Sequence, residues 1–147
     1  MQRLTIHHPY GVVGHLPWQA GQDRTPFGST DHGDRLLSLA QQIKTFKERE
    51  EDEKSISAIR KLVADSETIV FLGFAFHKRN MELITPNQPC NAKRVFATAK
   101  GISGSDSVVI KKKIDEFFGM KPGFEVNLQN RLDCHRLFNE YWRSLSS

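Results

Sequence analysis

Residues 68–74 read TIVFLGF, a run of β-branched and aromatic residues that ends at Gly73. A short apolar run bounded by glycine is typical of a strand that is buried on both faces. The stretch RVFATA at residues 94–99 has the same character. Between the two stretches, only residues 77–84 (HKRNMELI) have room for a short helix. Because a crossover of this kind joins parallel strands, we predict a parallel pair.

Downstream, the sequence predicts a helix, a strand and a second helix. The first helix begins at Ser105 and Asp106 and ends at Gly119, a residue that favours helix C-termini. Residues 124–128 alternate in polarity as a strand does. We expect Asn130 to cap the last helix, whose wide apolar stripe predicts burial along its length. The stripe consists of Cys134, Leu137, Phe138, Tyr141, Trp142 and Leu145.

Upstream, the pattern predicts two amphipathic helices, residues 34–46 and residues 55–66. Leu4 and Ile6 indicate a short strand before them. The intervening residues 12–33 contain four glycines and two prolines, which predict a long irregular loop.

Strands that alternate with helices define an α/β protein. We predict a three-layer, Rossmann-like open sheet that is mostly parallel, with helices on both faces. The 147 residues suffice for one core, so residues 1–147 are expected to form a single domain with the loop at 12–33. Ligands of such sheets bind at the carboxyl ends of the strands. The loops after Ile6, Leu72 and Ala99 are therefore the expected site.

The composition and the spacing of residues argue against a membrane protein, a metal site and a disulfide framework. No apolar run is long enough for a membrane helix and the first residues do not have the layout of a signal peptide, which predicts a cytoplasmic protein. Six histidines occur without a metal-binding spacing, so we expect no metal site. Cys90 and Cys134 are too few for a disulfide framework, and Cys134 is expected in the core rather than as a nucleophile.

Two motifs nevertheless point to a family. The first reads His8-Pro9-Tyr10-Gly11, and the second reads Gly73-Phe74-Ala75-Phe76 with Asn80 shortly after it. They resemble the carboxyl-proximal half of sirtuin-like NAD-binding domains, in particular those of bacterial defence proteins. In that family one strand ends in a His-Gly motif, and a later apolar strand runs into a Gly-Phe-Ser-Phe-like loop.

The resemblance implies that the chain binds NAD or an ADP-ribose-like nucleotide and acts as an NAD glycohydrolase in anti-phage defence. His8 or Tyr10 would orient the ribose hydroxyl or the attacking water. The residues that the resemblance assigns to the nucleotide are Gly11, Gly73, Phe74, Ala75, Phe76, Asn80 and Thr98.

The chain also departs from the family pattern. Tyr10 stands where the family has histidine, and a phenol with a pKa near 10 is a poor base at neutral pH. Ala75 stands where the family has serine. The family's upstream phosphate loop has no counterpart in this sequence, so we expect a sheet that is incomplete on its N-terminal side. A second copy or a partner chain would complete it, which predicts a homo-oligomer or a complex.

An alternative function is a non-catalytic interaction module. Residues 78–113 hold eight basic and two acidic side chains, within a chain of net charge +4. Such a stretch could bind nucleic acid or a protein partner. A solvated helix face explains the same charges, so nucleic acid is not the favoured partner.

Overall fold

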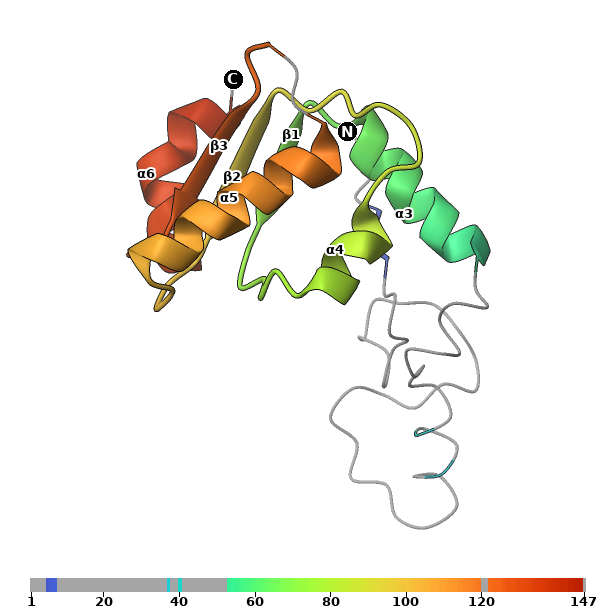
Figure 1. Cartoon of the computed structure of the whole chain (residues 1–147), viewed down its shortest axis with the longest axis horizontal. Coiled ribbons are helices and arrows are strands. Elements are labelled where there is room, and N and C mark those ends of the chain that lie inside the picture. The colour runs from blue at the N-terminus through green and yellow to red at the C-terminus, as the bar shows by residue number, and fades with distance from the viewer. Residues whose placement is uncertain (1–4, 8–36, 38–39, 41–52, 120–121, 147) are drawn as a thin grey trace. The chain divides into compact units, whose positions relative to one another are not determined.

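The computed structural model describes residues 5–7, 37, 40, 53–119 and 122–146. The chain divides into two compact units, residues 1–57 and residues 58–147, and the second contains the sheet (Figure 1). The helix expected at 34–46 and the loop expected at 12–33 lie almost entirely outside the described residues. The predicted single domain over residues 1–147 stays a prediction.

Three strands and four helices follow one another in the described residues, in the predicted order. They are α3 (Glu53–Asp65), β1 (Thr68–Phe71), α4 (Lys78–Ile84), β2 (Arg94–Thr98), α5 (Gly104–Phe118), β3 (Glu125–Gln129) and α6 (Cys134–Ser146). The strands form a parallel sheet in the order β1-β2-β3, in which Phe96 pairs with Val70 on one side and with Asn127 on the other. The predicted α/β class and open parallel sheet are thus confirmed. Among the residues that the structure describes, no helix is long and apolar enough to cross a membrane.

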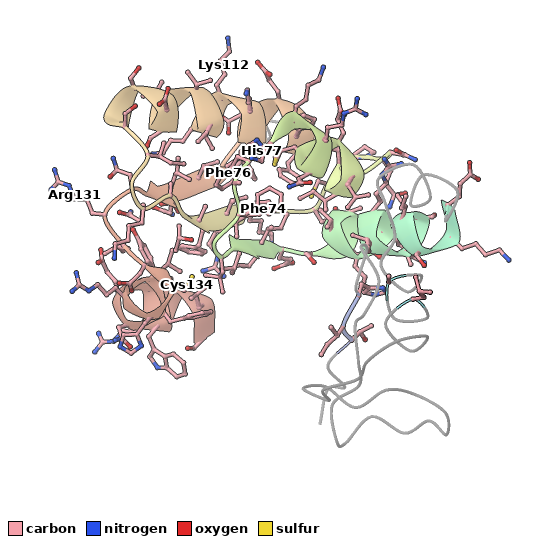
Figure 2. The ribbon with its side chains drawn as sticks, turned by 90° about the horizontal axis from the view of Figure 1, so that it is seen from below. Phe74, Phe76, His77, Lys112, Arg131 and Cys134 are labelled. Carbon is pink, nitrogen blue, oxygen red and sulfur yellow. The ribbon has the colours of Figure 1, made fainter. Side chains whose placement is uncertain are left out.

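The central strand β2 packs against a different helix with each face. Val95 and Ala97 are fully buried in the same apolar cluster as Ile114 of α5. The ring of Phe96 instead lies 5.0 Å from that of Tyr141 in α6. Neighbouring residues of a strand point to opposite faces, so α5 and α6 lie on opposite sides of the sheet, as Figures 1 and 2 show.

The strand at 68–74 is shorter and less buried than predicted. β1 ends at Phe71, and its first three residues are only half-buried. Leu72, just beyond the strand, is exposed. The reason is position: within the described residues β1 pairs only with β2 and forms an edge of the sheet, so one side of the strand is open.

The strand expected at Leu4 and Ile6 is also wrong for the residues described there. Thr5, Ile6 and His7 lie in neither a strand nor a helix, and the side chain of Ile6 is 61% exposed. Two alternating apolar residues do not stabilise a strand without a sheet face to bury them.

Helix α3 is tied to the segment that follows β1. The guanidinium of Arg60 donates hydrogen bonds of 3.0 Å to the carbonyl oxygens of Glu82 and Leu83 in α4. The backbone N–H of Asn91 donates to the carbonyl oxygen of Ala64, at 2.8 Å. These bonds fix the long connection between β1 and β2 against α3.

Two helix starts differ from prediction. The side chain of Ser103, not Ser105, accepts the capping hydrogen bond of α5, from the N–H of Asp106. Asp133 caps α6 in the same way, because its Oδ1 accepts from the N–H of Arg136 at 3.0 Å. The side-chain oxygen of a cap residue accepts from an N–H two or three residues further on. Ser103 and Asp133 therefore mark the positions at which α5 and α6 begin. Asn130, the predicted cap, instead donates to the carbonyl oxygen of Ile102.

The apolar stripe of α6 is only partly buried, contrary to prediction. Leu137 is fully buried and Tyr141 is half-buried beneath Phe96, and burial raises the pKa of the Tyr141 phenol. Trp142 is 66% exposed, and Phe138 and Cys134 are also exposed. A helix buries only the side that meets the sheet, and this stripe is wider than that side. The expectation that Cys134 belongs to the core is therefore wrong.

Candidate functional site

A hollow of about 330 Å³ lies at the carboxyl ends of the strands. Three segments line it: residues 73–75 after β1, residues 98–100 at the end of β2 and residues 132–134 at the start of α6. Ile102 completes the described lining. Parallel strands end at the same edge of a sheet, so these three loops converge there.

A side-chain hydrogen bond joins the first two loops. The backbone N–H of Gly73 donates to Oγ1 of Thr98 at 2.9 Å, and the Thr98 hydroxyl lies 3.5 Å from the carbonyl oxygen of Phe71. Gly73 has a φ of +61°, in the left-handed region that glycine adopts without steric cost. Thr98 is buried, so its hydroxyl serves to hold the loop after β1 against β2.

Aromatic packing holds the next residues of the same loop. Phe74, which lines the hollow, has its ring centroid 5.1 Å from Phe71 and 5.3 Å from Phe76. Phe76 is 4% exposed and has a φ of +53°, an unusual conformation for a bulky residue. Burial of the ring offsets the backbone strain. Figure 2 shows Phe74 and Phe76 on the side of the sheet that α4 and α5 cover.

The two ionised side chains in the described lining, Lys100 and Asp133, form an ion pair with each other. Nζ of Lys100 lies 3.4 Å from Oδ2 of Asp133. Nε of Arg136 lies 3.8 Å from the same oxygen. The N–H of Arg136 donates to the other oxygen of Asp133, and this bond, reinforced by Lys100, lowers the pKa of the Asp133 carboxyl despite partial desolvation. Asp133 is therefore a carboxylate at neutral pH.

The first residue of α6 brings a thiol to the same place. Cys134 lines the hollow, and it is a free and exposed cysteine. Figure 2 shows it at the start of α6, with Arg131 projecting outward from the preceding loop.

Four of the predicted nucleotide-binding residues meet in this hollow: Gly73, Phe74, Ala75 and Thr98. Phe76 lies behind them in the core. Asn80 is half-buried in α4 and is not part of the described lining. His8, Tyr10 and Gly11 lie outside the described residues, so their predicted roles stay predictions.

Sequence reasoning missed the third loop of the site. Residues 124–128 were expected to form a strand, and the carboxyl end of a parallel strand lies at the same edge as the others. Applied to this third strand, the same rule predicts that Leu132, Asp133 and Cys134 also line the site. Lys100 is the first residue of the loop after Ala99, which the sequence does predict as part of the site.

A second hollow, of about 380 Å³, lies at the amino ends of the strands, opposite the first hollow. Asp65, Glu67 and Lys93 line it, and the Lys93 ammonium lies 2.9 Å from the Glu67 carboxylate. Both side chains are largely exposed, and no predicted site residue lies there. Ligands of open parallel sheets bind at the carboxyl ends of the strands. The hollow lined by Thr98 is therefore the better candidate for a ligand-binding site.

Among the described side chains, no group of three or more histidine, cysteine, aspartate or glutamate residues could hold a metal ion. No family model matches the chain, and neither a curated protein nor a solved structure matches it.

Proposed function

We propose that this chain is a sirtuin-like domain that binds NAD or an ADP-ribose-like nucleotide at the carboxyl edge of its sheet. One observation carries the proposal: residues 73–75 and Thr98, assigned to the nucleotide by the family resemblance, line the same hollow. Within this proposal, the described elements belong to a three-layer, Rossmann-like sheet. An α/β sheet of this kind binds nucleotides where its parallel strands end.

The chemistry of the hollow supports a nucleotide. Phe74, Ala75, Ile102 and Leu132 offer apolar walls to a base. Gly73 itself has no side chain to keep a pyrophosphate away from its backbone. Asp133 and Lys100 together provide acceptors and donors for sugar hydroxyls.

The reaction that we propose for this site is hydrolysis of NAD. Water forms a bond to C1′ of the nicotinamide ribose while the glycosidic bond to nicotinamide breaks, which yields ADP-ribose, nicotinamide and a proton. His8 or Tyr10 would orient the ribose hydroxyl or the water. Consumption of NAD in the bacterial cytoplasm is the route by which such a protein would act against phage.

The proposal is tested by incubating the purified chain with NAD while both the heat of binding and the release of nicotinamide are followed. We expect binding, and a release that disappears in His8→Ala. His135→Ala is the matched control, because His135 is exposed on α6 and contacts Asn139. Retained release in His8→Ala would remove His8 from the mechanism, and the absence of both binding and release would overturn the proposal.

A second candidate is a non-catalytic interaction module. Lys111, Lys112 and Lys113 are exposed on α5, next to exposed Val108 and Val109, which favours a surface contact. Ionic strength separates this candidate from the first. Affinity for nucleic acid falls steeply with salt, whereas the affinity of a pocket for one dinucleotide falls far less.

Within the described residues one edge of β1 is unpaired, and the partner that we propose for it is a second copy of this chain or another chain that adds a strand. Sedimentation checks this point, since a monomer at all concentrations would contradict homo-oligomerisation.

A further inference from the structure

We propose that the exposed side of α6 binds single-stranded nucleic acid, with bases stacked on Phe138 and Trp142 and phosphates held by arginines. The proposal goes beyond the nucleotide site at the carboxyl ends of the strands and does not depend on it. It also concerns a different surface from the lysines of α5. Helices α5 and α6 lie on opposite sides of the sheet, as Lys112 and Cys134 do in Figure 2.

Two aromatic side chains form a row on this side of the helix. Phe138 is 41% exposed and Trp142 is 66% exposed. They are four positions apart in α6, so their side chains are neighbours on the helix surface. Exposed aromatic rings are the platforms on which successive bases of a single strand stack. Bases in a duplex are stacked on each other, so their faces are not free for these rings.

A second row on α6 is positively charged. Arg136 and Arg143 are exposed and seven positions apart, which places them on one side of the helix and about 10 Å apart along its axis. Arg136 approaches Asp133 at 3.8 Å, and no acidic side chain in the described part of the chain forms an ion pair with Arg143. The one acidic residue within α6 is Glu140, so the helix has a positive net charge. Guanidinium groups bind phosphate oxygens through paired N–H donors, so this row complements an anionic backbone.

Hydrogen-bonding side chains lie between the two rows. His135 and Asn139 are both exposed, and the Asn139 amide lies 3.1 Å from Nε2 of the His135 ring. Asn139 is one helical turn before both Trp142 and Arg143. An amide offers a carbonyl oxygen and two N–H donors, and the bond to His135 uses only part of this capacity. The rest can bond the edge of a base that is stacked on the indole.

The apolar area on this side of α6 is too small for a protein partner. Full burial of an aromatic side chain covers roughly 150–250 Å². At their exposed fractions, Phe138 and Trp142 together offer roughly 160–270 Å². The other large apolar side chains of α6 are buried or half-buried. A specific protein interface buries about 800 Å² on each partner, more than half of it apolar. Stacked bases need no more than the two rings.

The fluorescence anisotropy of a labelled oligothymidylate, titrated with the whole chain, tests the proposal. Its length is about 12 nucleotides, within the roughly 4–16 nucleotides that single-strand-binding folds cover. We expect tighter binding of this strand than of a duplex of the same length. Trp142→Ala should weaken binding about 5- to 150-fold, because stacking of a base is worth about 1–3 kcal/mol. Trp142→Phe keeps a ring and should recover most of the affinity.

The salt dependence tests the arginine row. For a single strand, the logarithm of the binding constant falls with the logarithm of the salt concentration, with a slope of about 0.7 for each phosphate contact. Arg143→Gln should therefore reduce the slope by about 0.7. Val108→Ala is the matched control for Trp142→Ala, because Val108 on α5 is 68% exposed. It should leave the affinity unchanged.

The remaining outcomes overturn the proposal. No binding of the single strand, tighter binding of the duplex, or an affinity that Trp142→Ala leaves unchanged would each contradict it. A loss of affinity in Lys112→Gln but not in Trp142→Ala would place the nucleic acid on α5 instead. Self-association that Trp142→Ala abolishes would show that a second copy covers α6. Circular dichroism confirms that the variants fold, and the NAD experiment stays separate because none of these variants is in the hollow.

Discussion

The backbone N–H of Gly73 donates a 2.9 Å hydrogen bond to Oγ1 of Thr98, so that the loop after β1 is held by the last residue of β2. The two residues are 25 positions apart in the chain and share the lining of one hollow. The Thr98 hydroxyl therefore helps to hold this part of the candidate site in shape.

Thr98→Val removes that hydroxyl while the volume of the side chain is almost unchanged. The net loss of one hydrogen bond is worth about 1 kcal/mol in the free energy of unfolding. Urea unfolding measures the loss, and Thr98→Ser should recover most of it. A valine variant as stable as the wild type would show that the bond contributes nothing.

Gly73→Ala tests the backbone of the same loop. A Cβ at this position would meet no heavy atom within 4 Å, so the cost arises from the φ of +61° alone. We expect a loss of about 1–2 kcal/mol in the free energy of unfolding. Gly104→Ala is the control, because Gly104 begins α5 and has equally open space without a positive φ. If both variants lose the same stability, backbone strain is not the cause.

Two substitutions in α6 separate its buried residues from its exposed ones. Leu137 is fully buried, so Leu137→Ala should cost about 2–5 kcal/mol in the free energy of unfolding. Trp142→Ala should cost about 0.5 kcal/mol or less, because the indole is 66% exposed. Thermal or urea unfolding of both variants checks the contrast. A large loss at Trp142 would indicate that another surface covers this residue in solution.

The carboxylate of Asp133, which caps α6, predicts that the free energy of unfolding depends on pH. The N–H of Arg136 and, to a lesser extent, Lys100 hold the pKa of Asp133 below its ordinary value of 3.8 in the folded chain. The charged form is thus favoured by folding, and its contribution to stability is fully present above that ordinary value. The contribution disappears as the pH falls through the lowered pKa.

Unfolding of the wild type and of Asp133→Asn between pH 3 and pH 7 measures this dependence. The stability advantage of the wild type should shrink at the acidic end, since the variant has no carboxyl at this position. An advantage that is constant over the range would contradict the role given to this group.

The order of elements from residue 53 onward was predictable because each element has a local signal. The alternation or density of β-branched residues indicates strands at 68–74, 94–99 and 124–128, and helical spacing indicates the segments between them. Gly119 was correctly placed at the end of α5. The same signals place Gly73 and Thr98 at the carboxyl ends of neighbouring parallel strands, where the structure shows their contact.

What the sequence did not predict depends on neighbours distant in the chain. The partial burial of β1 follows from its edge position, which its own residues do not encode. The exposure of Trp142 follows from how little of α6 meets the sheet. The ion pair of Lys100 and Asp133 joins residues 33 positions apart, so no local pattern reveals it.

The two oxygens of Asp133 serve different parts of the molecule. Oδ1 caps the start of α6, whereas Oδ2 pairs with the Lys100 ammonium. Substitution at position 100 would change the charge of the hollow and leave the start of α6 intact. The electrostatics of this hollow can therefore change without any change in how the chain folds.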